Sequence, residues 1–363
     1  MSAPRRSVVI NGRFLSQPLS GVQRFAWEVV RAMDAIRAAA PEHAGNALDL
    51  EILCPPQVCP LPRLHTIGAR AVGRMGGYAW EQIELPWAAR GRLVVNLSNL
   101  APILARKIST IHDAIVWQMP DNYTPAFVAA YRLLLPLIAR TSRHCVTVSE
   151  HSKRCLMEFG VTGKTPVTVI HNGIDHILDT AAAPPARPIH WPERFVFALG
   201  NAAPNKNAAL VHALAPRLRE HGIATIIAGG GNASVFADVA GRDTGAIALG
   251  RVPDSVIREG YGRALAFVFP SFHEGFGIPP VEAMALGCPV VASGTSAMPE
   301  ILGDAALLRD PTVSEQWLEA ILDIAGDPTL RDSLVEKGLA RAQRYRWDEA
   351  GRRLLALLLD TKR

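Results

Sequence analysis

The sequence TAAAPPARPIHWP, residues 180–192, divides the chain into two parts. Its four prolines in thirteen residues disfavour a continuous helix or strand, because proline fixes its own φ and lacks a backbone N–H. We therefore interpret residues 180–192 as a linker between a domain of residues 1–179 and a domain of residues 193–363. A chain of 363 residues is long enough for two domains of ordinary size.

On both sides of the linker, short β-branched runs alternate with amphipathic segments, a pattern that predicts a parallel sheet with covering helices. The fold class is therefore α/β, with two Rossmann-like domains facing a central cleft. The last helix, about 348–363, is expected to pack back on the first domain. The expected strands are residues 7–10, 48–53, 93–96, 109–112, 145–148, 167–170, 195–199, 223–228, 246–249, 266–269, 289–292 and 305–308.

Composition excludes several classes of protein. With 49% hydrophobic and 20% charged residues the chain is neither disordered nor collagen-like. Its most apolar long segment, residues 128–139, contains Arg132 and Pro136 and is shorter than the roughly 18 residues that span a bilayer. Five cysteines without a Cys-x-x-Cys pair, and an N-terminus without an apolar stretch, predict a reduced, cytoplasmic location.

The positive charge is concentrated in the first half of the chain. Residues 1–180 hold 19 Lys and Arg against 13 Asp and Glu, whereas residues 181–363 hold 19 against 20. This asymmetry indicates an anionic surface or substrate for the first domain. No nucleic-acid-binding motif accompanies the charge, so nucleic acid is not an expected partner.

Residues 269–282, FPSFHEGFGIPPVE, carry the strongest functional signal. Glu274 precedes a glycine-interrupted turn whose backbone amides can approach a phosphate or sugar closely. Glu282 is expected in the first turn of a helix beginning at Val281, where a carboxylate is favoured by the helix dipole and can accept from a ribose diol.

A second signal is Lys206, which we expect in the first turn of a helix. A cation there opposes the helix dipole, so an anion such as a diphosphate is expected to offset it. Residues 228–231, AGGG, lack the last glycine of a dinucleotide fingerprint, so nicotinamide binding is weakly supported.

The first domain has two further polar clusters. Ser20 and Gln23 form a plausible capping box for a helix through about Ala39, with Gly21 at its mouth, where free amides could receive a phosphate. His112 and Asp113 follow a strand and could be a catalytic pair, a donor-sugar contact or a simple turn.

Residues 269–311 resemble the donor-site region of the family-4 retaining glycosyltransferases of GT-B fold, in which seven residues separate two glutamates. The resemblance extends, in the same order, to SGVQRF (20–25), TIHD (110–113), TVSEHSK (147–153), IHNGID (170–175) and ALGNAAPNKN (198–207). It implies a GT-B architecture and transfer of a sugar, with retention, from a nucleoside diphosphate to an acceptor hydroxyl. No cofactor is implied, because the nucleotide-sugar is a substrate.

The resemblance also implies a role for individual residues. Glu282 would hold the ribose, Glu274 the donor sugar, and Lys206 the leaving diphosphate, while His112 would face the sugar from the first domain. The family commonly has an Arg where this chain has Asn205, which puts part of the diphosphate binding in doubt. The implied donor site is completed by Gly21, Gly200, Val252, Gly275, Phe276, Gly277 and Ile278. No Asp-x-Asp occurs in the chain, so we expect no metal ion in the reaction.

The acceptor is less clearly indicated. It is expected to be a saccharide or a polyprenyl-diphosphate-linked saccharide. Arg132, Arg140 and Arg143, with Asp113, are candidate acceptor-side residues, and the three arginines fall on one side of a helical projection. Residues 63–92 interleave arginines with Tyr78, Trp80 and Trp87. Both segments suit an anionic membrane surface, but residues 128–139 are equally consistent with a core helix whose arginines are solvated.

Other functions remain open from the sequence. A GT-B nucleotide-sugar epimerase would share the nucleotide site, and a non-catalytic module would bind the nucleotide-sugar without transferring it. A dehydrogenase would need a better glycine fingerprint. Within the transferase interpretation, mannose from GDP-mannose, used for a surface polysaccharide, is the donor that we expect by resemblance.

Overall fold

The computed structural model describes residues 6–40, 47–179, 189–200, 203–229 and 245–361. The chain forms two compact units. Unit 1 comprises Met1–Gly173 together with Arg346–Arg363, and unit 2 comprises Ile174–Tyr345. The units therefore divide earlier in the chain than the expected boundary at residue 179. Of the proposed linker, residues 180–188 lie outside the described residues, and residues 189–192 precede the first strand of unit 2.

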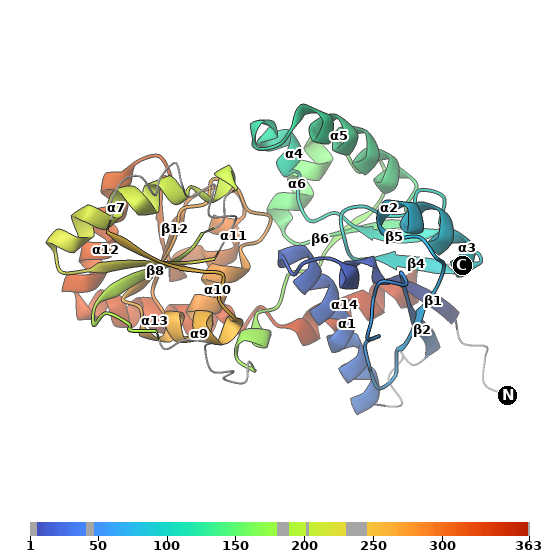
Figure 1. Ribbon diagram of the computed structural model, residues 1–363, viewed down its shortest axis with the longest axis horizontal. Coiled ribbons are helices and arrows are strands. Elements are labelled where there is room, and N and C mark those ends of the chain that lie inside the picture. Colours follow the sequence, from blue (N-terminus) through green and yellow to red (C-terminus); the bar gives the residue numbers. More distant parts are fainter. Residues whose placement is uncertain (1–5, 41–46, 180–188, 201–202, 230–244, 362–363) are drawn as a thin grey trace. The chain divides into compact units, whose positions relative to one another are not determined.

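Unit 1 contains a parallel sheet of seven strands in the order β3-β2-β1-β4-β5-β6-β7 (Figure 1). The strands are β1 (Arg6–Asn11), β2 (Leu48–Cys54), β3 (Gly68–Ala71), β4 (Leu93–Asn96), β5 (Lys107–Thr110), β6 (His144–Thr147) and β7 (Val167–Val169). Its helices are α1 (Gly21–Ala39), α2 (Gly77–Ala79), α3 (Leu85–Ala89), α4 (Ile115–Gln118), α5 (Pro125–Arg140), α6 (Glu150–Glu158) and α14 (Trp347–Asp360). Short helical segments are η1 (Gly12–Ser16), η4 (Pro120–Asn122) and the π-helical η3 (Trp80–Glu84).

Three expectations for unit 1 need correction. Strand β5 ends at Thr110, so His112 lies in the loop beyond it. Strand β3 was missed, because its sequence GARA has no run of β-branched residues. Helix α1 has the expected bounds, but the Ser20 hydroxyl bonds the side-chain oxygen of Gln23 instead of the backbone amide that a capping box requires.

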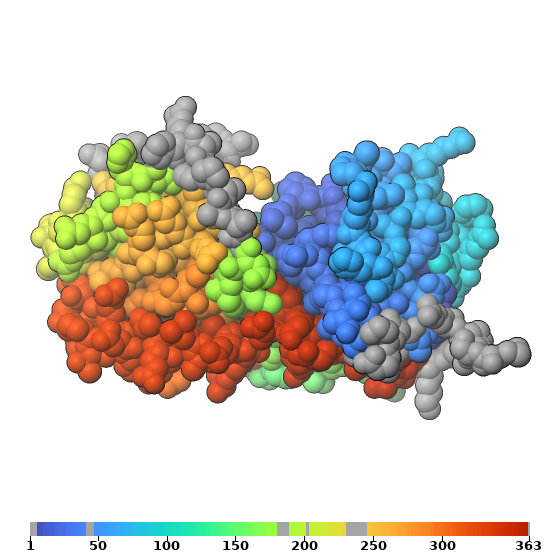
Figure 2. Space-filling view, turned by 90° about the horizontal axis from the view of Figure 1, so that it is seen from below, coloured from blue at the N-terminus to red at the C-terminus, as the bar shows by residue number. Residues whose placement is uncertain are grey.

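The C-terminal helix α14 belongs to unit 1, where it packs against α1. Gly351 lies against the backbone and Cβ of Ala32, so a side chain at this position would hold the two helices apart. Arg6 adds a hydrogen bond of 2.9 Å to the carbonyl of Leu358. In the space-filling view, red C-terminal residues accordingly border the blue surface of the N-terminal segment (Figure 2).

Unit 2 contains a parallel sheet of six strands in the order β10-β9-β8-β11-β12-β13 (Figure 1). The strands are β8 (Phe195–Leu199), β9 (Ala224–Ala228), β10 (Ala246–Gly250), β11 (Ala266–Phe269), β12 (Val290–Ser293) and β13 (Leu307–Arg309). The helices are α7 (Ala208–Glu220), α9 (Asp254–Arg263), α10 (Ile278–Ala285), α11 (Met298–Leu302), α12 (Ser314–Gly326) and α13 (Pro328–Ala342), with short segments η5 (Asp175–Ile177), η6 (Pro204–Lys206) and η7 (Gly303–Ala305).

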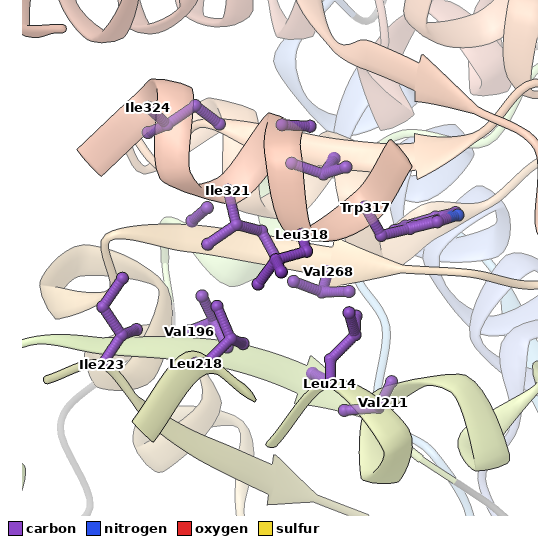
Figure 3. Packing of buried hydrophobic residues seen from close by; sticks show 14 of the residues in the cluster. Val196, Val211, Leu214, Leu218, Ile223, Val268, Trp317, Leu318, Ile321 and Ile324 are labelled. Atoms are coloured by element: carbon purple, nitrogen blue, oxygen red, sulfur yellow. The ribbon is translucent and has the colours of Figure 1, made fainter. Parts of the chain in front are cut away.

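The core of unit 2 follows the two-residue period of its strands. Val196 and Val268 face helices α7 and α12, where Leu214 and Trp317 complete one buried cluster (Figure 3). On the opposite face of the sheet, Phe197 and Phe267 contact the ring of Tyr261 on α9. Helices therefore cover both faces of the sheet, as is usual for an all-parallel sheet.

Each sheet has a point where the strand order reverses, between β1 and β4 in unit 1 and between β8 and β11 in unit 2. In open α/β sheets, ligands bind outside the carboxyl ends of the strands at such switch points. The loops that follow these four strands are therefore the first places to look for a site.

Candidate active site

The switch point of unit 2 brings together the two charged residues that the sequence singled out. Lys206 lies on η6 after β8, and Glu274 lies in the loop after β11. Their side chains form an ion pair, with Nζ 2.5 Å from Oε1. The Lys206 ammonium also lies 5.6 Å from the centroid of the Phe269 ring. Both side chains are largely buried, at 23% and 13% exposed, so the pair is strengthened by a reduced local dielectric.

Asn205 fastens the two loops to each other. Its carbonyl accepts a hydrogen bond of 2.7 Å from the Phe272 amide, and its side-chain amide donates to the His273 carbonyl at 3.2 Å. The Glu274 amide in turn donates to the Ser296 hydroxyl at 3.0 Å. Asn205 is 8% exposed, so this residue supports the loops from within.

Lys206 does not lie in the first turn of the following helix, where it was expected. Helix α7 begins at Ala208, after Asn207 in the left-handed conformation (φ 51°), so Lys206 precedes it. The charge of Lys206 is offset by the Glu274 carboxylate. An anion entering this site would therefore compete with Glu274 for the ammonium.

The turn after Glu274 is buried and depends on glycine for its conformation. Gly277 adopts φ 85° and lies against the end of Met298, so only glycine fits there without displacing that side chain. Phe276 is buried, with its ring edge-on to Tyr345 at 5.2 Å. Gly275 is also buried, and Ile278 is the first residue of α10. The backbone contacts that were expected for Phe276, Gly277 and Ile278 stay predictions.

Glu282 does not lie in the first turn of its helix, because α10 begins at Ile278 and not at Val281. The expected stabilisation by the helix dipole is therefore wrong. Instead, two side chains hold the carboxylate: His176 Nε2 lies 2.8 Å from one oxygen, and the Tyr261 hydroxyl donates to the other at 3.2 Å. Burial, followed by the charge of Glu282, raises the pKa of Tyr261, so its hydroxyl stays a donor.

The remaining expected donor residues of unit 2 lie at strand ends of the same sheet. Gly200 follows β8, and its carbonyl touches Gly229 so closely that a side chain at Gly229 could not be accommodated. Val252 is half-buried in the loop between β10 and α9. Contact of Val252 with a base stays a prediction.

His112 lies in unit 1, in the loop after β5, and is 6% exposed. Its Nε2 lies 3.1 Å from the Leu97 carbonyl, and its ring is edge-on to Phe25 at 5.1 Å. Since a carbonyl only accepts, Nε2 carries the proton and Nδ1 is the acceptor. Burial lowers the pKa of His112, which favours the neutral ring. Asp113 accepts from the Ile115 amide at 3.1 Å, an Asx-type turn.

The expected first-domain surface residues are only partly brought together. Helix α5 ends at Arg140, so Arg143 lies in the following turn and not on the helical face that was projected for it. Arg132, Arg140 and Arg143 are all exposed, as the notion of a charged surface requires. Trp80, in contrast, is fully buried in the core, whereas Trp87 is 76% exposed. Gly21 is exposed as the first residue of α1.

Sequence reasoning missed His176, Tyr261 and Ser296, the residues that orient the two glutamates. His176 directly follows the motif at residues 170–175, which is the one available signal. Within the described ranges, acidic, histidine and cysteine side chains nowhere gather in threes as a metal site would need, and no helix is long and apolar enough to cross a bilayer. The absence of a metal from the reaction stays a prediction.

The second part of the chain is similar to a known protein family. Residues 182–341 match the family described as glycosyl transferases group 1. An O-antigen chain mannosyltransferase B of Escherichia coli is 42% identical over 100 residues, which are 28% of this chain and 26% of that protein. The O-antigen chain mannosyltransferase RfbU of Salmonella typhimurium is 27% identical over 258 residues, 64% of this chain and 65% of that protein. The chain thus spans less than two thirds of the length of either relative.

Solved structures share the fold along nearly the whole chain. A sucrose-phosphate synthase from Thermosynechococcus elongatus has a TM-score of 0.73 at 15% identity and covers 98% of both chains. HepE from Anabaena, solved in complex with UDP-glucose, has a TM-score of 0.69 at 16% identity and covers 98% of this chain and 100% of its own. The GT-B class expected from the sequence, two Rossmann-like α/β domains, is confirmed.

Proposed function

We propose that this protein transfers a sugar from a nucleoside diphosphate to a hydroxyl of a saccharide or lipid-linked saccharide, because residues 182–341 match the family described as glycosyl transferases group 1. The observation that carries the proposal is the Lys206–Glu274 pair at the switch point of unit 2. A cation for the diphosphate and a carboxylate for sugar hydroxyls stand side by side there, with the Gly277 turn next to them.

In the proposed reaction Lys206 exchanges partners. When the donor binds, its ammonium turns from Glu274 to the diphosphate, and the Glu274 carboxylate becomes an acceptor for hydroxyls of the donor sugar. Glu282, held by His176 and Tyr261, accepts from the ribose diol. His112 would offer Nδ1 to the sugar, because its Nε2 is committed to Leu97. Charge on the leaving group is thus met by side chains and amides, without a metal ion.

We propose that the reaction proceeds with retention by front-side displacement. The bond between the anomeric carbon and the diphosphate oxygen breaks, and a bond to the acceptor oxygen forms on the same face. The departing phosphate oxygen takes the acceptor's proton. Positioning and electrostatic stabilisation of the developing negative charge are then the tasks of the protein.

Mannose from GDP-mannose is the proposed donor substrate, and a surface polysaccharide the proposed product. The support for mannose is that both relatives are O-antigen chain mannosyltransferases. The complex of HepE with UDP-glucose supports a nucleotide-sugar as the ligand class, with a different base and sugar.

We also propose that helix α5 rests on an anionic membrane surface at the cytoplasmic side. Leu133 and Leu137 are 69% and 41% exposed, one turn apart on α5, and Arg132 and Arg140 are exposed on the same helix. Exposed leucines flanked by arginines are typical of helices that lie in a lipid interface. This composition favours a lipid contact over a merely solvated charged face.

A panel of nucleotide-sugars and free nucleotides, screened by thermal shift, tests the donor. A ligand at 100 times its dissociation constant stabilises the folded state by about 2.7 kcal/mol, which separates GDP-mannose from weaker binders. Transfer of a radiolabelled sugar to an added saccharide then separates a transferase from an epimerase and from a non-catalytic module. Binding without transfer to any acceptor would contradict the proposal.

A further inference from the structure

The switch point of unit 1, between β1 and β4, holds a buried polar network that none of the proposed roles uses. Asn11 at the end of β1 donates to Glu81 at 2.7 Å and to Asn96, at the end of β4, at 2.6 Å. The guanidinium of Arg13 lies 3.0 Å from the same Glu81 carboxylate. Glu81 is fully buried and Arg13 is 6% exposed.

Such a network is expensive to bury unless its charges are paired. Arg13 neutralises Glu81 directly, so the site presents little net charge to a ligand. Burial raises the pKa of Glu81, while the nearby charge of Arg13 and the hydrogen bonds from Asn11 and Arg13 oppose that shift. A ligand drawn to this place would therefore be neutral and hydroxylated rather than anionic.

Tyr78 covers the network on its outer side. Its ring centroid lies 4.5 Å from the Arg13 guanidinium carbon, and the residue is 54% exposed. Burial raises the pKa of the Tyr131 hydroxyl of α5, and the neighbouring Tyr78 raises it further. The Tyr78 ring therefore lies against the buried Arg13, while another part of the ring remains exposed to solvent.

The aromatic surface continues along one face of α5 and the segment before it. Tyr131 stacks on Phe127 at 4.0 Å, and Phe127 stacks on Tyr123 at 4.9 Å. All three residues are partly exposed. We call Tyr78, Tyr123, Phe127 and Tyr131 the aromatic strip. Phe127 is covered on both faces by its stacked neighbours, so the strip offers a ligand the exposed Tyr78 ring as an apolar surface and the tyrosine hydroxyls as polar partners.

We propose that the aromatic strip is a binding site for a neutral pyranose ring of the acceptor saccharide. The apolar C–H face of the sugar would lie on the exposed part of the Tyr78 ring, and its hydroxyls would exchange hydrogen bonds with the tyrosine hydroxyls. This inference rests on the proposed function for its acceptor, and it commits to the sugar of the acceptor rather than to a lipid diphosphate.

Saturation-transfer NMR on the full chain tests the stacking directly. The probe is an α-linked mannobiose, added in excess with GDP present, and the aromatic protons of the protein are irradiated. Saturation should reach the ring protons of the sugar in the wild type. Tyr78→Ala should weaken mannobiose binding about fivefold to tenfold, the equivalent of one lost aromatic contact. Tyr78→Phe keeps the ring and should stay within about threefold of the wild type.

Trp87→Ala, which removes another exposed aromatic residue of unit 1, is the matched control and should leave mannobiose binding unchanged. GDP affinity and thermal unfolding, measured on each variant, show whether the fold and unit 2 are intact. Mannobiose affinity that is unchanged in Tyr78→Ala and in Phe127→Leu, or no saturation transfer to the sugar in the wild type, would overturn the inference. Sugar transfer with an unchanged acceptor KM in Tyr78→Ala would do so while leaving the proposed function standing.

Discussion

Lys206 and Glu274 form an ion pair of 2.5 Å between Nζ and Oε1, although they come from different loops 68 positions apart in the sequence. Asn205 fixes this relationship, because it bonds the loop that carries Glu274 on two sides. Because of this pair, the Lys206 ammonium is already in place before a donor binds. It is held there by Glu274, which would later contact the donor sugar. A donor must therefore supply enough negative charge to displace Glu274, which a diphosphate does.

Loss of Lys206 should affect the chemical step more than donor binding. Its charge matters most when negative charge develops on the leaving diphosphate, so Lys206→Ala should lower kcat by about 10²-fold or more and raise the donor KM less. Steady-state kinetics with varied donor check this prediction. Lys337→Ala, which removes an exposed paired lysine of unit 2, is the control. A higher KM with an unchanged kcat would show instead that Lys206 stabilises the bound donor and the transition state equally.

Glu282→Ala should weaken binding of the free nucleoside diphosphate by roughly 2 to 3 kcal/mol, the range for charge-assisted hydrogen bonds. The variant leaves His176 and Tyr261 without their shared carboxylate, so its thermal unfolding must be measured alongside calorimetric titration with GDP. Glu315→Ala removes an exposed glutamate and serves as the control. Unchanged GDP affinity in a folded Glu282→Ala variant would exclude the ribose role.

Lys107 should make a contribution to the free energy of unfolding that grows with pH just above pH 8. Its side chain is fully buried, and burial lowers its pKa to about 8, while Ile103 and Thr141 accept its hydrogen bonds. Above that value the unfolded chain binds a proton that the folded chain has released, so the contribution of Lys107 increases by about 1 kcal/mol between pH 8 and pH 9.

Three buried thiols should oppose this contribution over the same pH range. Burial raises the pKa of the Cys54, Cys145 and Cys288 thiols to about 12, so the folded chain keeps protons that the unfolded chain loses. Urea unfolding at a series of pH values separates the two effects when Lys107→Met is compared with the wild type. Between pH 8 and pH 9 the free energy of unfolding should fall more steeply with pH in Lys107→Met than in the wild type. Equal slopes in the variant and the wild type would show that Lys107 makes no such contribution.

Binding to anionic vesicles should depend on the exposed arginines. Each of Arg132, Arg140 and Arg143 should contribute on the order of 1 kcal/mol near an anionic surface, and added salt should screen the attraction over about 10 Å at 0.1 M. Cosedimentation of the triple Arg→Gln variant should therefore fall, whereas Arg→Gln changes at the exposed Arg331, Arg344 and Arg353 should have little effect. GDP affinity should be unchanged. A wild type that ignores anionic vesicles at low salt would contradict the membrane proposal.

The sequence predicts most strands, because in parallel sheets they are short, buried, β-branched runs; β8 and β11 have the expected bounds. It places Lys206 and Glu274 at strand ends, and the sheet topology explains why they meet. The sequence could not reveal the ion pair itself, which depends on the bracing by Asn205, nor the support of Glu282 by Tyr261 on another helix. Sequence patterns that span a few residues do not indicate which side chains from distant segments meet in the fold.

Helix starts were less predictable for a similar reason. We expected α10 to start at Val281, yet the helix begins at Ile278 and includes two prolines, which are well tolerated in a first helical turn. Glu282 therefore lies beyond the first turn of α10. Arg143 does not lie on the expected face of α5, because the helix ends at Arg140, before the turn that leads into β6.

The most direct test of the central claim is the fate of the sugar itself. The protein is incubated with GDP-α-mannose and mannobiose, with and without EDTA, and NMR follows the anomeric proton of the product. The account predicts an α-linked mannosyl product, one GDP released for each sugar transferred, a rate unaltered by EDTA, and loss of the reaction in Lys206→Ala. A β-linked product, a rate abolished by EDTA, or conversion of the donor without a new glycosidic bond would contradict it.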